Sequence, residues 1–163
     1  MRGIFAGIDP GKKGALAAFC SFHGEHDGVI SAYRTERCFM AGKQYRPSAM
    51  RDALREIGAE FVTIEKVGAM PGQGVVSMFS FGRGAGLWEG LVCGLDISYL
   101  LVHPATWHKE LLKDMAKGKH SSIVAAERLF PQFTAKHKAD EAIAEALLIA
   151  EFGRRVRQGG GEK

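Results

Sequence analysis

Short apolar runs separated by turn residues dominate the first third of the chain. Residues 3–9 and 14–20 are predicted to form two buried strands on either side of a Pro-Gly turn, and residues 28–36 a third strand after a polar turn. Because short loops join the three strands in sequence, we expect them to pair as an antiparallel meander.

From residue 47 onward, helical and extended patterns alternate. Residues 47–57 have an early proline and apolar residues at helical spacing, and Gly58 follows as a stop signal. Strands are predicted at 60–66 and 97–103, the first nearly all apolar and therefore central. Further helices are predicted at 74–95, from Pro104, at 119–129 and at 140–155. This order predicts an α/β fold, in which a five-stranded mixed sheet has helices on both faces.

The predicted helix at 74–95 combines apolar residues on all sides with repeated glycines. Gly82, Gly86 and Gly90 recur every four residues, which lowers helix propensity but allows another element to pack closely. A helix that is apolar all round is buried on more than one side. One side suits the sheet and the other a second copy of the chain; a monomer with a thick core is the alternative.

Composition is that of one globular domain. The chain has 163 residues, of which 46% are hydrophobic and 25% charged, and we expect a domain at 1–157 and a disordered tail at 158–163. Three cysteines without a CxxC motif, no signal peptide and no membrane-length apolar segment predict a cytoplasmic protein. The net charge of +4 permits nucleic-acid binding but is weak evidence for it alone.

Carboxylates stand at the ends of apolar segments in three places. Asp9 closes the first strand and Glu65 the strand at 60–66, and three more acids begin the last helix, namely Asp140, Glu141 and Glu145. Acids at two strand ends and one helix start can hold divalent ions such as Mg²⁺, which prefers oxygen ligands. Two ions about 4 Å apart promote phosphodiester cleavage, so the pattern predicts a metal-dependent nuclease.

Each of these acids also has a plain structural explanation. Asp before Pro-Gly is a common turn residue, and acids in the first turn of a helix complement its dipole. On the last helix, Glu141 and Glu145 lie four residues apart and share a face. Asp140 is one position off that face, although a residue at a helix start can turn inward.

Three segments resemble the RuvC group of Holliday junction resolvases, with its phage-type branch most similar around residues 70–84. They are Gly7–Gly11, Ile64–Glu65 and Ala144–Ala150, and the resemblance extends over roughly residues 3–155. It implies an RNase H-like fold and a homodimer that cuts four-way DNA junctions symmetrically with Mg²⁺ or Mn²⁺, two ions to a site. It also implies a role in DNA recombination and repair, in a bacterium or a phage-infected cell.

The resemblance assigns roles to particular acids. Asp9, Glu65 and Glu145 match three catalytic acids of the group and are expected to bind metal. The fourth acid would fall at position 142, which is alanine here. Glu141 or Asp140 must therefore take over, and helical phase favours Glu141 as the fourth metal ligand.

A glycine-rich loop follows Glu65 and provides candidate DNA contacts. In the RuvC group this loop probes the junction and can wedge an apolar side chain between bases. Lys66, Met70 and Gln73 are the candidates here, with Met70 as the wedge. A plain connector between strand and helix is the alternative.

Further basic residues are candidate phosphate contacts. Arg83 interrupts the apolar helix, and Lys117 and Lys119 precede the helix at 119–129. Residues 34–51 add five more cations, in a stretch expected to form a loop on the DNA side or ordinary surface. A solvated basic face is the alternative for Lys117 and Lys119, and a side chain that simply extends into solvent is the alternative for Arg83.

Two other functions remain open. One is a different RNase H-like nuclease that acts on RNA–DNA hybrids or structured RNA. The other is a junction-binding homologue without catalysis, in which the displaced fourth acid marks lost chemistry.

Overall fold

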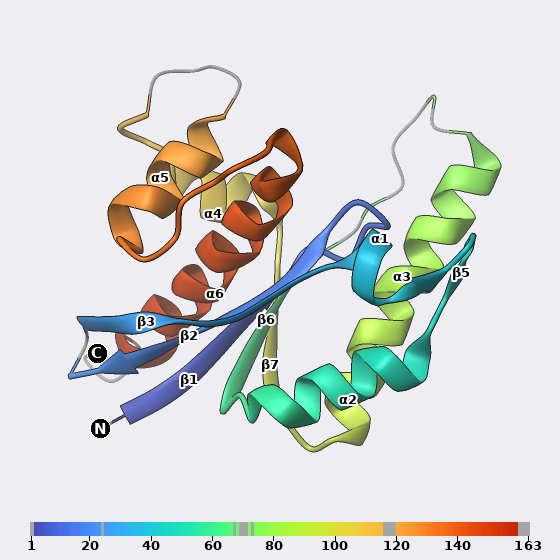
Figure 1. The fold of residues 1–163 in the computed structure, drawn as a ribbon, viewed down its shortest axis with the longest axis horizontal. Helices are drawn as coiled ribbons and strands as arrows, with labels where there is room; N and C mark the ends of the chain where they lie inside the picture. The colour runs from blue at the N-terminus through green and yellow to red at the C-terminus, as the bar shows by residue number, and fades with distance from the viewer. Residues whose placement is uncertain are drawn as a thin grey trace.

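The computed structural model describes residues 2–23, 25–66, 68, 72, 74–115 and 120–159. Its main sheet has the strand order β3-β2-β1-β6-β7 (Figure 1). These strands are β1 (Arg2–Ile8), β2 (Ala15–Phe22), β3 (Glu25–Arg34), β6 (Phe61–Glu65) and β7 (Ser98–Val102). The first three pair antiparallel, whereas β6 pairs parallel to both β1 and β7. The predicted five-stranded mixed sheet is confirmed.

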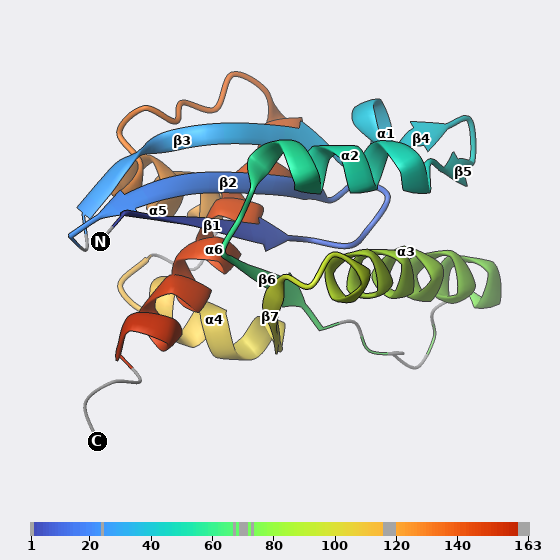
Figure 2. The same ribbon diagram turned by 90° about the horizontal axis from the view of Figure 1, so that it is seen from below.

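Helices cover both faces of this sheet. Helices α4 (Pro104–Leu111), α5 (Ser121–Leu129) and α6 (Glu141–Gly159) group on one side, and α2 (Pro47–Ile57) and α3 (Val75–Gly94) on the other (Figures 1 and 2). Side chains alternate along β1, so that Phe5 packs into the core under α6 and Ala6 into the core under α2 and α3. Each face of the sheet therefore has its own core.

Helix α6 lies directly on the sheet at two glycines. A Cβ atom at Gly7 of β1 would clash with the Ala146 carbonyl oxygen and would lie 2.5 Å from the Ala150 amide nitrogen. A Cβ atom at Gly153 of α6 would clash with the hydroxyl of Thr63 on β6. This close approach is possible because glycine has no side chain, and it fixes the amino-terminal turns of α6 beside the carboxyl ends of β1 and β6.

Short elements fill the stretch after β3 that the sequence left irregular. A one-turn helix α1 (Thr35–Cys38) leads into a small hairpin of β4 (Met40–Ala41) and β5 (Gln44–Tyr45). Elements this short carry no periodic pattern, so sequence reasoning could not find them. Phe39 and Tyr45 are buried and anchor the segment to the core beneath α2 and α3.

The last helix differs at both ends from its predicted range of 140–155. A 3₁₀ turn, η1 (Lys138–Asp140), precedes it, and α6 begins at Glu141 and continues to Gly159. The helix thus extends two residues into the segment expected to be a tail, and residues 160–163 lie outside the described residues. In the part of the chain that the structure describes, no helix combines the length and apolar character needed to cross a membrane.

Helix α3 buries one stripe rather than its whole surface. Gly84, Trp88 and Val92 face the core, whereas Val75 and Phe79 are 77% and 74% exposed. Among the described residues, the single chain therefore leaves part of the apolar surface of this helix uncovered.

Candidate active site

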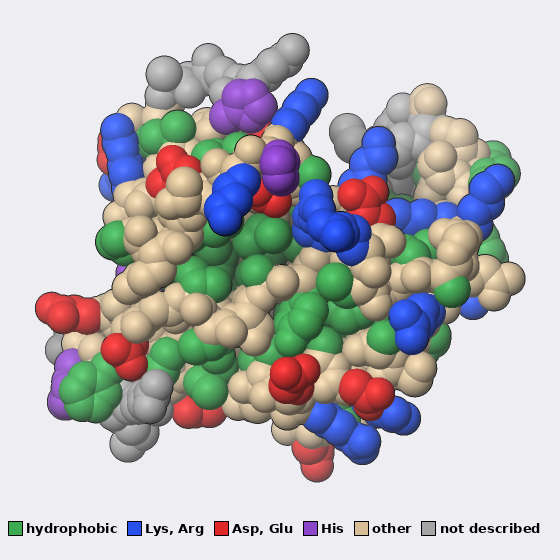
Figure 3. All heavy atoms as spheres, in the orientation of Figure 1, with side chains coloured by type: hydrophobic (Ala, Val, Ile, Leu, Met, Phe, Trp, Pro, Cys, Tyr) green, Lys and Arg blue, Asp and Glu red, His purple; other side chains and the backbone are tan. Residues whose placement is uncertain are grey.

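Acids from two elements line one cavity at the carboxyl end of β1. Asp9 follows β1 directly, and Glu141 and Glu145 project from the first two turns of α6 into the same cavity of about 700 Å³. We call it the acid cavity. On the face of the molecule drawn in Figure 3, Lys and Arg side chains gather around acidic ones along the upper edge.

A tight turn holds Asp9 in place. Its amide donates to the Ala15 carbonyl oxygen at 3.0 Å, and its carboxylate accepts the Gly11 amide at 3.2 Å. The backbone of Gly14 packs against the same carboxylate, since a Cβ there would lie 2.7 Å from the Asp9 Cγ. Burial raises the pKa of Asp9, and the Gly11 hydrogen bond offsets this only in part.

Glu65 ends β6, the strand paired with β1, so its backbone lies beside that of Asp9. The buried indole of Trp107, on α4, donates to its carboxylate at 2.8 Å. Burial raises the pKa of Glu65, the Trp107 hydrogen bond lowers it, and the charge of Asp9 raises it again. Asp9 and Glu65 are therefore close enough to repel each other.

The pKa of Glu145 depends on the charges of the three other acids. Burial and then the charges of Asp9, Glu65 and Glu141 raise its pKa to about 7, against a weaker opposing hydrogen bond from the Ser122 hydroxyl at 3.4 Å. Glu145 is thus coupled by charge to Asp9, Glu65 and Glu141, and we call these four predicted metal ligands the acid cluster.

This cluster fits a hard divalent cation by the chemistry of its donors. All four side chains offer carboxylate oxygens, and their mutual repulsion is relieved when a cation lies between them. Among the described residues, no three His, Cys, Asp or Glu side chains are already close enough to hold a metal ion. A bound ion would therefore need the side chains of the cluster to move together.

Asp140 lies apart from the acid cavity. Its carboxylate accepts the amides of Lys136 at 2.9 Å and His137 at 3.0 Å and so stabilises the turn before α6. Burial raises its pKa, but these two hydrogen bonds and the charges of Arg34 and His137 outweigh burial and lower it. The geometry favours Glu141 over Asp140 as the fourth acid.

The structure describes only two of the six predicted DNA contacts. Lys66 is exposed directly after Glu65, and Arg83 is exposed on α3, where its charge lowers the pKa of the Tyr45 hydroxyl against the larger effects of burial and Asp9. The other four lie outside the described residues, namely Met70, Gln73, Lys117 and Lys119.

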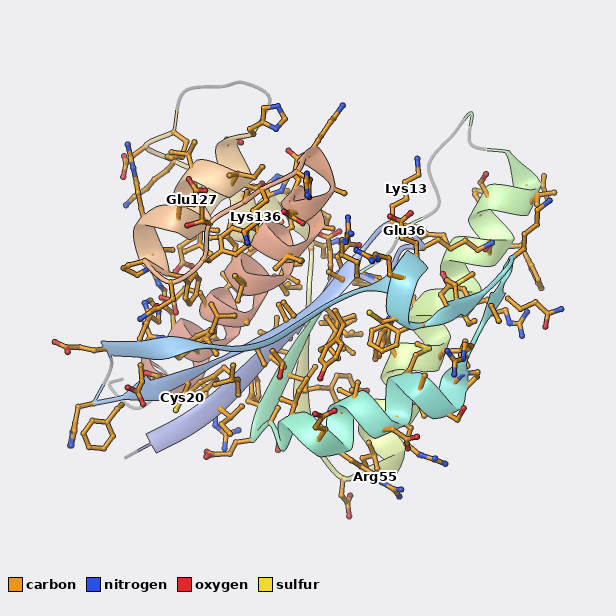
Figure 4. The ribbon with its side chains drawn as sticks, in the orientation of Figure 1. Lys13, Cys20, Glu36, Arg55, Glu127 and Lys136 are labelled. Atoms are coloured by element: carbon orange, nitrogen blue, oxygen red, sulfur yellow. The ribbon has the colours of Figure 1, made fainter. Side chains whose placement is uncertain are left out.

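Several residues at the site were missed by sequence reasoning. Lys13, Glu36 and Lys138 line the acid cavity with the acids. Figure 4 shows Lys13 and Glu36 at the same edge, one from the turn after β1 and the other from α1. The sequence offered a signal only for Lys13, which follows the Asp-Pro-Gly turn, because the position of the other two depends on how distant elements pack.

Tyr45 and Gly84 support the turn that carries Asp9. A Cβ atom at Gly84 on α3 would clash with the Tyr45 hydroxyl and would lie 2.7 Å from the Pro10 carbonyl oxygen. The Tyr45 hydroxyl is buried and has no hydrogen-bond partner among the described residues. The β4–β5 hairpin, α3 and the turn that carries Asp9 thus meet at a position where only glycine fits.

Solved structures share this fold over almost the whole chain. RuvC of Thermus thermophilus in complex with a Holliday junction substrate matches with a TM-score of 0.70 at 16% identity, over 96% of each chain. A second structure of T. thermophilus RuvC matches with a TM-score of 0.68 at 15% identity, over 96% of each chain. The yeast mitochondrial Holliday junction resolvase Ydc2 matches with a TM-score of 0.55 at 12% identity, over 96% of this chain and 80% of that one.

Sequence similarity to curated proteins is more limited. The chain is 33% identical over 85 residues to the chloroplastic Holliday junction resolvase MOC1 of Chlamydomonas reinhardtii, a match that covers 51% of this chain and 10% of that protein. The matched segment is thus a small part of a much longer relative. No protein-family model matches the chain. By its structure, the chain has the RNase H-like fold of the RuvC resolvases, which it resembles over its described length.

Proposed function

We propose that this protein is a metal-dependent endonuclease that resolves four-way DNA junctions. The coupled cluster of Asp9, Glu65, Glu141 and Glu145 at the carboxyl ends of two paired strands carries the proposal. The fold supports the choice of substrate, because a protein of similar structure is known in complex with a Holliday junction.

The four carboxylates are the groups that would hold the metal. Two Mg²⁺ or Mn²⁺ ions there would lower the pKa of the attacking water and offset charge on the leaving oxygen. The chain's own contribution is orientation: the Gly11 amide fixes Asp9 and the Trp107 indole fixes Glu65. A carboxylate held by such a hydrogen bond loses less rotational freedom on binding an ion.

Basic residues beside the acids would bind the DNA backbone. Lys13 and Lys138 line the acid cavity. Lys66 is exposed directly after Glu65 in the sequence, and Arg83 is exposed on α3. Cations that neutralise phosphates supply most of the sequence-independent affinity for DNA. Outside the described residues, we expect Lys117 and Lys119 to act in the same way, Met70 to wedge between bases, and Gln73 to contact the DNA.

The exposed face of α3 supports a homodimer. Val75, Phe79, Gly82, Gly86 and Gly90 follow one another along this face, and Cβ atoms at all three glycines would meet open space. A second copy that packs there would cover the exposed apolar side chains and allow the helices to cross closely. A two-fold dimer also supplies the two acid clusters that paired cuts require.

Sedimentation of wild type and Gly86→Glu tests the dimer. We expect a dimer for the wild type and a monomer for Gly86→Glu, because a buried unpaired carboxylate opposes association. Ser48→Glu, at an exposed site on α2, should leave the dimer intact. A monomeric wild type, or a dimeric Gly86→Glu, would contradict this interface.

Comparison of substrates tests the activity. We would offer a four-way junction, a linear duplex and an RNA–DNA hybrid, each with Mg²⁺, with Mn²⁺ and with chelator. Cleavage of the junction alone, lost with chelator, is the expected result. Hybrid cleavage would instead indicate another RNase H-like nuclease, and tight junction binding without cleavage would indicate a non-catalytic binder.

We also propose that the protein acts in the cytoplasm of a bacterium or a phage-infected cell, because the DNA substrate would lie there. The domain boundary near residue 157 also stays a proposal.

A further inference from the structure

A second cavity, of about 500 Å³, adjoins the acid cavity between the turn after β1 and the first turns of α3. We call it the side cavity. Gly11, Lys13 and Phe81 line both cavities, so the two share a wall. Its other described lining includes Lys12, Val76, Ser77 and Ser80. Neither the sequence pattern nor the proposed chemistry of the acids gave this cavity a role.

We propose that the side cavity binds one nucleotide of the cleaved DNA strand, next to the phosphate that lies at the acids. This inference rests on the proposed nuclease function and adds a subsite to it. The shared wall carries the proposal, because a strand that places one phosphate in the acid cavity can continue along Gly11, Lys13 and Phe81 into the side cavity.

The polar side of the side cavity suits a phosphate. Lys12 and Lys13 are consecutive cations in the turn, and within the described residues neither has a carboxylate in ion-pair distance. Ser77 and Ser80 add hydroxyl donors from one face of α3. Lysine ammonium and serine hydroxyl groups are common partners of backbone phosphate oxygens.

The apolar side suits a sugar or base. The Phe81 ring packs against the turn, since a Cβ at Gly11 would lie 3.1 Å from its Cε2 atom, and this contact fixes the ring at the boundary of the two cavities. Val76 is 84% exposed and lies on the rim. An aromatic ring fixed beside a phosphate site can stack on a base without regard to its identity. Phosphate donors and an aromatic wall in one cavity are the pattern expected for a nucleotide.

Binding to junctions with a single abasic nucleotide tests the proposal. We would move the abasic position stepwise through the junction centre and measure Kd in chelator, so that no cleavage is needed. For the wild type we expect about tenfold weaker binding at one position in each cleaved strand. Ser77→Trp fills the side cavity from an exposed site. This variant should bind intact junction about tenfold more weakly, and its Kd should no longer depend on the abasic position.

Two further variants complete the test. Ser48→Trp, on the exposed surface of α2, should behave like the wild type. Lys12→Gln should lower the slope of log Kd against log salt concentration by about 1, the change expected for one lost phosphate contact. A wild type indifferent to every abasic position, or a Ser77→Trp protein that keeps the dependence, would overturn the proposal. Equal binding of intact junction and linear duplex would instead contradict the proposed function. The failure of the function and the failure of the subsite can therefore be told apart.

Discussion

Asp9 and Asp140 show how the local backbone decides what an acid can do. Both accept amide hydrogen bonds, but Asp9 has one at 3.2 Å in a buried turn, whereas Asp140 has two near 3 Å on a more open surface. Burial therefore dominates at Asp9 and raises its pKa, and hydrogen bonds dominate at Asp140 and lower it. A carboxylate that is costly to ionise without a cation is suited to bind one.

Substitution of Glu141 and of Asp140 should have different consequences. Glu141→Gln removes an oxygen ligand from the acid cavity, and we expect the single-turnover cleavage rate to fall at least about 100-fold. Asp140→Asn should change the rate only a few-fold but lower the free energy of unfolding by about 1 kcal/mol, because it weakens two hydrogen bonds before α6. Rates and urea unfolding measure the two effects, and the opposite order would place Asp140 at the metal.

The pKa of Glu145 predicts how the metal-free protein responds to pH. Its folded-state pKa of about 7 lies above the ordinary 4.5, so between these values the folded state binds more protons than the unfolded state. Stability is therefore fully present below pH 4.5 and is lost as pH rises to about 7, by on the order of 3 kcal/mol. Glu145→Gln should remove this loss.

Urea unfolding in chelator at pH 5, 6, 7 and 8 measures this effect. Glu56→Gln, at an exposed acid on α2, is the control and should follow the wild type. Parallel profiles for Glu145→Gln and wild type would show that Glu145 does not titrate in this range.

Sequence reasoning found the acids of the site but not their partners. Asp9, Glu65 and Glu145 were identified because each stands at the end of an apolar segment or matches a motif. Trp107 and Ser122 could not be found in this way, since their contacts with Glu65 and Glu145 span 42 and 23 residues of chain. Such contacts depend on packing that no local pattern records.

At the scale of elements, glycine positions control how closely the helices approach the site. On α3, Gly84 lies against Tyr45 and the Pro10 carbonyl, whereas Gly94 meets open space. The same substitution on one helix should therefore have opposite results at the two positions.

Alanine substitution tests this difference. Gly84→Ala should lower the free energy of unfolding by about 2 kcal/mol and reduce cleavage, because the added methyl group displaces the turn that carries Asp9. Gly94→Ala should leave cleavage unchanged and stability equal or higher by up to about 1 kcal/mol. Thermal unfolding and cleavage rates measure both, and equal effects at the two sites would contradict the packing described.

Long helices and strands could be predicted from the sequence. Very short strands, and which side of an apolar helix the chain buries, could not. Helix α2 matches its predicted range because a proline, a helical period and a terminal glycine all mark it, and Gly58 has the positive φ of 60° that favours glycine. The β4–β5 hairpin was missed because its strands have two residues each. On α3 the apolar pattern was real, but the single chain buries only one stripe of it.

At the scale of the whole molecule, one buried carboxylate joins the edge of the sheet to α6. Glu151 is 1% exposed and accepts His26 of β3 at 2.9 Å, and Arg154 and Arg155 of α6 at 2.7 Å each. Burial alone would raise its pKa, but these hydrogen bonds lower it to about 2. The outer strand is thus tied to the helix that carries Glu141 and Glu145, two of the proposed catalytic acids.

Glu151→Gln should destabilise the whole domain. We expect the free energy of unfolding at pH 7 to fall by about 3 kcal/mol, because the arginines lose their buried charged partner. With a folded pKa near 2, below the ordinary 4.5, the stabilisation is present above pH 4.5 and is lost as pH falls toward 2. Urea unfolding at pH 7, 4 and 3 should therefore show the variant and the wild type converging, and an equal difference at all three values would contradict this role.

We propose that Asp9 serves a metal-dependent cut rather than DNA binding. Cleavage of a four-way junction labelled on each strand in turn, by wild type and by Asp9→Asn, distinguishes these two roles. We predict symmetric paired nicks by the wild type in Mg²⁺ or Mn²⁺, and no nicks by Asp9→Asn, which should bind the junction with unchanged Kd. Cleavage retained by Asp9→Asn would contradict the assignment of the acid cluster as the active site.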